Sequence, residues 1–273
     1  MSLKTGHEYI ASIEALELEA NILGVKSADL TRHPLVKPSL QAVATTFDCA
    51  HSEENRPLFR VRSSLTGEEI NRFNHLHQST ADLTSKVIMQ RTCGNLTGCC
   101  FQRCVGMDAA NATFSVTYEC DRTHGTHYHQ RFIDYWKRVQ REDLVVDGAM
   151  TDPKGDRGKR PKEQADLDLY LRVVERKSEG VVVRGAKFHQ TGLLNSHEVM
   201  VMPTVNLGPG EEDWAICFAL PTNTPGLRFI YGRQASDTRN WKAPHSTWAI
   251  RPLVDRRSCS SLMTCSSPMN ASF

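Results

Sequence analysis

The chain has 273 residues, 40% hydrophobic and 23% charged, which allows one large domain or two smaller ones, each with its own core. Because 33 Lys and Arg nearly balance 31 Asp and Glu, no overall field attracts nucleic acid or an anionic membrane, and we expect neither as a partner. The N-terminus lacks the apolar core of a signal peptide, and no apolar run approaches the roughly 20 residues of a membrane span. We therefore expect a soluble, cytoplasmic protein whose nine cysteines are reduced.

The first half of the chain carries the spacing of amphipathic helices. A capping box at Thr5 and Glu8 predicts a helix that continues to Leu23. Pro38 predicts the start of a second helix, because proline is favoured in the first helical turn. Inward-facing residues of the second helix are predicted to be Leu40, Val43, Ala44 and Phe47.

Three more helices are predicted before residue 147. Ser79 is the expected N-cap of one of them, with Leu83 and Val87 facing the core. Another is expected from Cys99 to Tyr118. The last is indicated by the helical spacing of Phe132, Tyr135, Trp136 and Val139.

After Asp147 the pattern changes to strands. Residues 169–174 and 180–184 flank a turn and predict a β-hairpin. Three further strands are predicted at 199–202, 215–219 and 227–231. Helices followed by strands indicate an α+β fold, with a helical domain over 1–146 and a β-domain over 147–245.

Three cysteines, Cys99, Cys100 and Cys104, fall within six positions. On a helix, Cys100 and Cys104 lie one turn apart on the same face, where two sulfurs can bind one metal centre. Cysteine is also a small hydrophobic residue, so spacing alone leaves buried packing open as an alternative.

Two polar loops are candidate ligand sites. The first, Met150 to Gly158, lies between the two predicted domains, a favoured place for ligands. An ordinary solvated turn is the alternative for this loop. The second, Lys187 to Gly192, follows a predicted strand, and Gly192 would let the backbone approach a flat ligand closely.

Other histidine and glycine patterns indicate no specific chemistry. The spacing of His124, His127 and His129 fits no standard metal site, and we expect the start of a surface helix there. Neither a Gly-x-Gly-x-x-Gly nor a Walker-type loop occurs, so the sequence does not support a Rossmann or P-loop nucleotide site.

From Tyr9 to Arg239 the chain resembles the 4-hydroxyphenylacetate 3-hydroxylase family of flavoproteins. The stretches that carry the resemblance are Asn71-Arg72-Phe73, Leu76-His77-Gln78-Ser79-Thr80, Cys100-Phe101-Gln102-Arg103-Cys104-Val105-Gly106-Met107-Asp108-Ala109, Asp147-Gly148-Ala149-Met150-Thr151-Asp152-Pro153-Lys154-Gly155-Asp156-Arg157-Gly158 and Asn195-Ser196-His197-Glu198. The fold that this resemblance implies is acyl-CoA dehydrogenase-like: a helical N-terminal domain, a middle β-barrel, and a C-terminal helical bundle that this chain lacks.

The resemblance also implies two cofactors. Cys100 and Cys104 match two ligands of a 4Fe-4S cluster, whose remaining His and Cys ligands lie in the family's C-terminal bundle; Cys99 matches no ligand. Gln102 and Arg103 are expected to orient the cluster, with Gln102 as the single tentative catalytic residue. The residues that match FAD contacts are Met150, Thr151, Asp152, Pro153, Lys154, Asp156, Arg157, His189, Gln190, Thr191 and Gly192.

The activity implied by the cysteine pair is the radical dehydration of 4-hydroxybutyryl-CoA to crotonyl-CoA, with a vinylacetyl-CoA isomerase activity, in a full-length homotetramer. The alternative enzyme is an FAD-dependent aromatic hydroxylase, the branch of the family that carries no such cysteine pair. A third interpretation is an inactive, truncated fragment.

Residues 246–273 show no family resemblance, no strand alternation and no helical period. We interpret them as a non-homologous tail read out of frame. From the missing bundle we expect little dehydratase activity from this chain alone, together with an exposed edge where the barrel lacks a strand.

Overall fold

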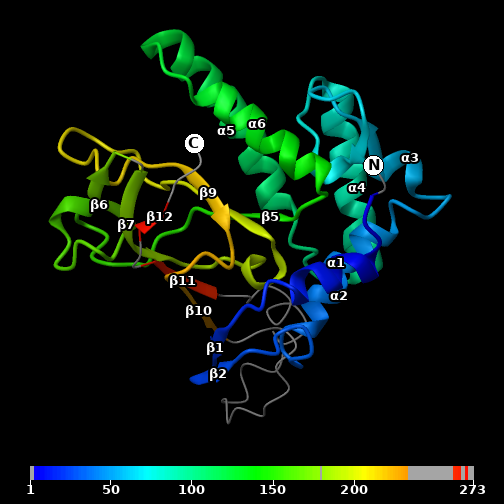
Figure 1. Ribbon diagram of the computed structural model, residues 1–273, viewed down its shortest axis with the longest axis horizontal. Coiled ribbons are helices and arrows are strands. Elements are labelled where there is room, and N and C mark those ends of the chain that lie inside the picture. The colour runs from blue at the N-terminus through cyan, green and yellow to red at the C-terminus, as the bar shows by residue number, and fades with distance from the viewer. Residues whose placement is uncertain (1–2, 179, 233–260, 266–267, 270–273) are drawn as a thin grey trace.

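The computed structural model describes residues 3–178, 180–232, 261–265 and 268–269. Helices and strands segregate into two regions, and a hairpin of two long helices projects from between them (Figure 1). The helices are α1 (Gly6–Glu14), α2 (Lys37–Asp48), α3 (Arg56–Phe59), α4 (Thr80–Thr97), α5 (Cys104–His124) and α6 (Tyr128–Arg141), with 3-10 turns at Arg72–Asn74, Pro161–Glu163 and Leu193–Asn195.

The strands form three sheets. They are β1 (Ala20–Ile22), β2 (Val25–Ser27), β3 (Arg60–Arg62), β4 (Glu69–Asn71), β5 (Val146–Ala149), β6 (Arg172–Lys177), β7 (Gly180–Lys187), β8 (Glu198–Val201), β9 (Phe218–Pro221), β10 (Leu227–Tyr231), β11 (Ser261–Cys265) and β12 (Pro268–Met269). The largest sheet has the order β12-β7-β11-β10-β1-β2, with β6 paired to β7; β3 pairs with β4, and the third sheet has the order β5-β8-β9. Among the described residues these sheets are separate, rather than joined in the expected barrel.

Several predicted element boundaries are confirmed. Thr5 and Glu8 form the capping box of α1, and Pro38 lies in the first turn of α2. Ser79 caps α4, and its hydroxyl accepts from the Asp82 amide. Strands β6 and β7 form the predicted hairpin, and α6 begins directly after His127, as expected for that histidine-containing segment.

The first predicted helix is wrong beyond Glu14. Its C-cap is Ala15, and Glu17 has φ of 51°, a left-handed conformation that ends a helix. Ala20 and Ile22 are buried on either side of exposed Asn21, which is the alternation of a strand, and β1 pairs in parallel with β10. The first half of the chain thus contributes β1 and β2 to the largest sheet, although it is otherwise mainly helical.

The inward face of α4 also differs from the prediction. Leu83 and Val87 are 47% and 62% exposed, whereas Met89 and Cys93 are buried. Those two sulfur-containing side chains pack in a core with Phe73. The spacing of Leu83 and Val87 is helical, but spacing does not say which side of a helix finds a neighbour.

The tail forms strands that its sequence pattern did not predict. Strand β11 pairs antiparallel with both β10 and β7, and β12 pairs with β7. Strand pairing uses backbone groups, so it does not require alternating side chains. Residues 246–260, 266–267 and 270–273 of the predicted tail lie outside the described residues.

Two close contacts join the helices to the β5-β8-β9 sheet and to the 3-10 turn before β8. The Tyr9 ring of α1 stacks on Phe47 of α2, with 4.8 Å between centroids, and its hydroxyl donates to the Asn195 carbonyl at 2.6 Å. Helix α5 packs on β5 so closely at Gly106 that no side chain fits there. The start of α5 and the start of β5 therefore lie together.

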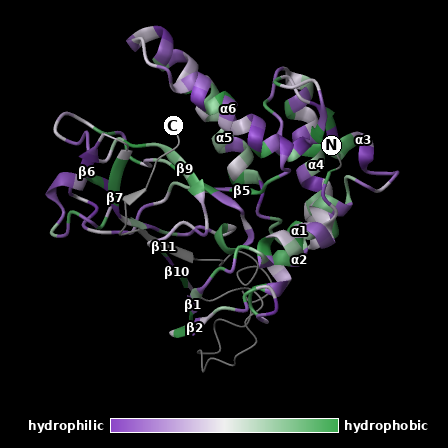
Figure 2. Cartoon of the chain, in the orientation of Figure 1, coloured by the Kyte–Doolittle hydropathy of each residue, from purple (hydrophilic) through white to green (hydrophobic). Residues whose placement is uncertain are grey.

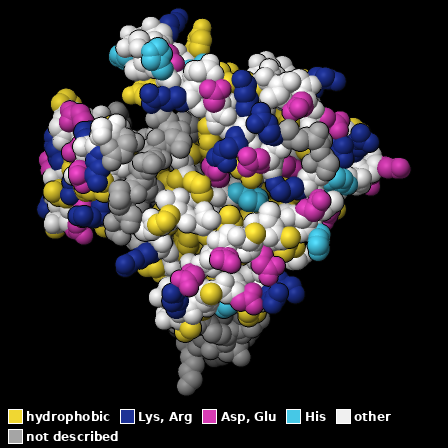
Figure 3. Space-filling model, viewed as in Figure 1, with side chains coloured by type: hydrophobic (Ala, Val, Ile, Leu, Met, Phe, Trp, Pro, Cys, Tyr) yellow, Lys and Arg dark blue, Asp and Glu magenta, His cyan; other side chains and the backbone are white. Residues whose placement is uncertain are grey.

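The surface carries charges of both signs, interspersed over the face in Figure 3, with histidines at the tip of the projecting hairpin. Figure 2 shows the projecting end of α5 and α6 as mainly hydrophilic. No helix among the described residues combines the length and apolarity that crossing a bilayer requires.

Candidate functional site

The two candidate metal ligands lie together, but not on one helix. Helix α5 begins at Cys104, and Cys100 lies in the preceding loop, because Gln102 has φ of 59° and interrupts the helical path. The Cys104 thiol donates a hydrogen bond to the Cys100 sulfur. This bond and one from the Gln102 amide lower the pKa of Cys100 to about 6 and raise that of Cys104. A thiolate at neutral pH is the form that binds metal.

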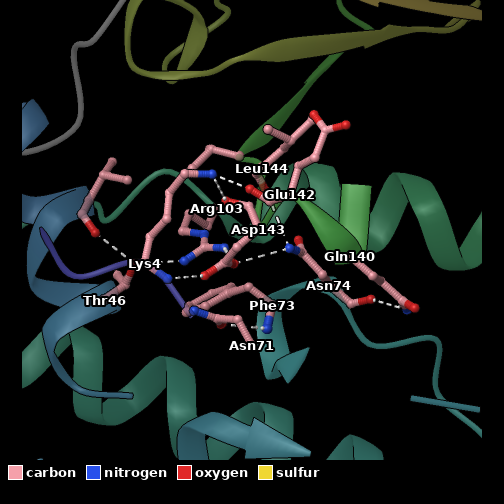
Figure 4. Close-up of polar contacts among 12 residues, drawn as sticks. Lys4, Thr46, Asn71, Phe73, Asn74, Arg103, Gln140, Glu142, Asp143 and Leu144 are labelled. Atoms are coloured by element: carbon pink, nitrogen blue, oxygen red, sulfur yellow. Dashed lines mark hydrogen bonds and ion pairs between the residues drawn. The ribbon is translucent and has the colours of Figure 1, made fainter. Parts of the chain in front are cut away.

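Arg103 holds the cysteine loop from behind. Its guanidinium lies between the Phe47 and Phe73 rings, 4.3 and 4.6 Å from their centroids, and it donates to the Thr46 hydroxyl at 3.1 Å. The buried Asp143 carboxylate is its ion-pair partner at 3.9 Å (Figure 4). A rigid, buried side chain directly before Cys104 fixes where that thiol lies.

Asp147, the second residue of β5, lies close to the thiol pair. It is fully buried, and burial raises its pKa to about 7, with the negative charge of Cys100 acting in the same direction. Amides of Gly148 and Gly192 donate to this carboxylate, whereas its Oδ2 has no hydrogen-bond partner within the described part of the chain. A buried acidic group with a free oxygen therefore lies beside the cysteines.

The two predicted flavin loops meet in the structure. The Phe188 amide donates to the Thr151 carbonyl at 2.8 Å, and the Gln190 side-chain amide reaches the same oxygen at 3.4 Å. Six of the residues predicted to contact flavin are exposed to solvent: Met150, Thr151, Lys154, Asp156, Arg157 and His189. His189 has a left-handed backbone, with φ of 61°, and its ring lies against the Phe188 ring, 4.0 Å between centroids.

The second flavin loop also contacts the cysteine loop. A Cβ added at Gly192 would lie 3.0 Å from the Gln102 carbonyl and 3.2 Å from Asp147 Oδ1. The Asn195 side chain donates to the Gln102 side-chain oxygen. Because Gly192 has no side chain, the cysteine loop can approach the second flavin loop closely. The thiol pair and this flavin loop therefore lie in one site.

Sequence reasoning missed three residues of this site: Asp147, Lys187 and Asn195. Asp147 and Asn195 are the first residues of two of the family motifs, and Lys187 is the first residue of the second loop. Only their position in those stretches could have indicated them, because their partners lie far away in the sequence.

Cys100 and Cys104 are the two candidate metal ligands at this place. Within the described residues, no group of three or more His, Cys, Asp or Glu side chains is arranged to hold a metal ion. Cys99 is exposed.

Residues 5–249 match the family model described as 4-hydroxyphenylacetate 3-hydroxylase N terminal. The chain is 51% identical over 237 residues to the 4-hydroxybutyryl-CoA dehydratase/vinylacetyl-CoA-Δ-isomerase of Clostridium aminobutyricum, covering 87% of this chain and 48% of that protein. A solved structure of the oxygen-tolerant archaeal 4-hydroxybutyryl-CoA dehydratase from N. maritimus matches with a TM-score of 0.88 and 43% identity, over 99% of this chain and 54% of that one.

A more distant solved structure, the oxygenase component of 4-hydroxyphenylacetate 3-monooxygenase complexed with FAD, matches with a TM-score of 0.72 and 22% identity, over 99% of this chain and 55% of that chain. At this identity the match shows a shared fold. The chain spans about half the length of the curated relatives that it matches. The resemblance inferred from the motifs is confirmed: the chain belongs to the 4-hydroxyphenylacetate 3-hydroxylase family.

Proposed function

We propose that the chain carries the thiol and flavin loops of an enzyme that dehydrates 4-hydroxybutyryl-CoA to crotonyl-CoA and isomerises vinylacetyl-CoA. The 51% identity to the Clostridium aminobutyricum relative of that name carries the proposal. The proposal includes the finer features implied by the family: FAD, a 4Fe-4S cluster, the acyl-CoA dehydrogenase-like layout, a cytoplasmic location and a homotetramer of the full-length protein.

The thiol pair fits half of an iron–sulfur site. Cys100 and Cys104 are free thiols that are hydrogen-bonded to each other, and the lowered pKa of Cys100 favours its thiolate. Asp147 and the Gln102 side chain line the same place and would hold substrate or water near the cluster.

The two polar loops fit a flavin. Thr151 and His189 are exposed at their junction, and the exposed cations Lys154 and Arg157 have the charge that would pair with the diphosphate of FAD. The family relative solved with FAD has the same fold. When bound, the flavin would supply one-electron chemistry, and the cluster would supply a Lewis acid for the departing hydroxyl.

An aromatic hydroxylase would share the flavin loops but would need no metal. The bonded thiols beside the flavin loop favour the dehydratase, because a hydroxylase has no use for a metal-ligating pair there. Buried packing does not explain Cys100, because this residue is exposed.

Turnover tests the proposal. Since the chain spans about half of its relatives, residues 1–245 are joined to the C-terminal half of the Clostridium aminobutyricum relative and purified without oxygen, with iron and FAD. We expect this protein to convert 4-hydroxybutyryl-CoA to crotonyl-CoA. Chromatography of the CoA esters measures the conversion. Hydroxylation of 4-hydroxyphenylacetate with reduced FAD and oxygen, and no dehydration, would instead support the hydroxylase.

A further inference from the structure

We propose that Lys187 is a positioning residue for the ligand loop Met150–Gly158, and that it sets where Thr151 stands at the ligand face. This inference deepens the proposed function, because the ligand it concerns is FAD. Lys187 is the last residue of β7 and matches none of the expected cofactor contacts.

The Lys187 ammonium is buried and fully bonded. Its side chain is 3% exposed, and Nζ donates to the Met150 carbonyl at 2.9 Å, the Met202 carbonyl at 2.8 Å and Asp152 Oδ1 at 2.6 Å. An ammonium has three hydrogens, so each finds one acceptor. Burial lowers the pKa of Lys187, and the neighbouring Asp152 carboxylate opposes that shift.

Two of the three groups that accept from Lys187, the Met150 and Met202 carbonyls, directly follow strands of the β5-β8-β9 sheet. Met150 and Met202 directly follow β5 and β8, which pair in parallel, so their carboxyl ends lie at one edge of the β5-β8-β9 sheet. Lys187 belongs to the largest sheet. Its side chain therefore joins the two sheets where the ligand loop begins.

This anchoring assigns different tasks to consecutive loop residues. Asp152, 10% exposed, is paired with Lys187 and faces inward, whereas Thr151 is exposed. The Thr151 carbonyl accepts from the Phe188 amide, the residue after Lys187, so the same anchor aligns the two flavin loops. Burying a lysine is unfavourable unless its partners replace the lost hydration, and a loop that needed no fixed position would not require such a lysine.

The test compares Lys187→Met with Lys162→Met in the 273-residue chain. Lys162 is an exposed lysine whose Nζ donates to the Pro209 carbonyl, so it is the matched control. We expect Lys187→Met to speed hydrogen exchange of residues 150–158 and of the Phe188 amide. We also expect it to weaken FAD binding at least tenfold, as measured by flavin fluorescence. Lys162→Met is expected to leave both unchanged.

A double variant separates positioning from stability. Lys187→Met with Asp152→Leu removes both buried charges, so we expect thermal stability to recover while FAD affinity stays low. FAD affinity within twofold of wild type in Lys187→Met would overturn the proposal. So would recovery of affinity in the double variant.

The exchange measurement keeps this inference separate from the proposed function. If the wild-type chain binds no FAD, the flavin proposal fails for this chain, and unchanged exchange over 150–158 in Lys187→Met would still overturn the anchoring role. If Lys187→Met does not fold, Asp152→Asn, which keeps the acceptors and removes the partner charge, is expected to give both changes at smaller size. No change in either would overturn the proposal.

Discussion

Gly106→Ala is expected to destabilise the chain by about 3 kcal/mol or more, at the upper end of overpacking effects. An added Cβ would lie 1.8 Å from the Val146 carbonyl oxygen and 2.7 Å from its carbonyl carbon. Both are backbone atoms of β5, so relief requires α5 to move away from the strand. Because Gly106 follows Cys104 and Val146 precedes Asp147, the same movement would separate the thiol pair from the carboxylate.

Urea unfolding followed by circular dichroism measures this effect, and Gly94→Ala is the matched control. Gly94 also lies inside a helix, α4, but an added Cβ there meets no atom within 4 Å. It should stabilise the chain by about 0.5 to 1 kcal/mol, because alanine has the higher helix propensity. A Gly106→Ala protein as stable as wild type would contradict the close packing of α5 on β5.

Arg103→Met is expected to cost about 3 to 5 kcal/mol, the range for removing one partner of a buried ion pair. The change leaves the buried Asp143 carboxylate without its cation and removes the group stacked between Phe47 and Phe73. Asp143 keeps the weaker support of the Lys4 amide at 3.1 Å, the nearby Lys4 charge and the Asn74 side chain at 3.5 Å (Figure 4).

Two further variants show whether the charge or the shape matters. Arg62→Met removes an exposed arginine that donates to the Gly67 carbonyl, and it should change stability by less than about 0.5 kcal/mol. Arg103→Met with Asp143→Leu should recover part of the loss, since it leaves no unpaired buried charge. If the double variant is less stable than Arg103→Met, the ion pair is not the cause.

Local signals in the sequence predicted the starts of α1, α2 and α4. Thr5, Pro38 and Ser79 act through their own side chains on the next few residues, so no knowledge of the fold is needed to interpret them. The end of α1 was missed because it depends on Glu17 adopting a left-handed backbone and on β1 pairing with β10, more than 200 residues away.

The candidate site was predicted only in part, because some of its contacts join segments that lie far apart in the sequence. Motif resemblance brought Cys100, Cys104 and the two polar loops to attention, and the structure brings them together. It could not show that Cys100 precedes the helix, since that follows from the backbone at Gln102. Asp147 was missed because it matters only through contacts with distant segments.

Iron analysis of the thiol variants tests the central claim, that Cys100 and Cys104 bind a cluster beside a flavin loop. Residues 1–245 joined to the C-terminal half of the Clostridium aminobutyricum relative are purified without oxygen, and iron per chain is measured for wild type, Cys100→Ser, Cys104→Ser and Cys120→Ser. Cys120 lies on α5 outside the bonded pair. We predict iron in wild type and Cys120→Ser, and at least about tenfold less in the other two, because a lost ligand weakens metal binding more than a lost supporting contact does. Equal iron in all four proteins would contradict the account.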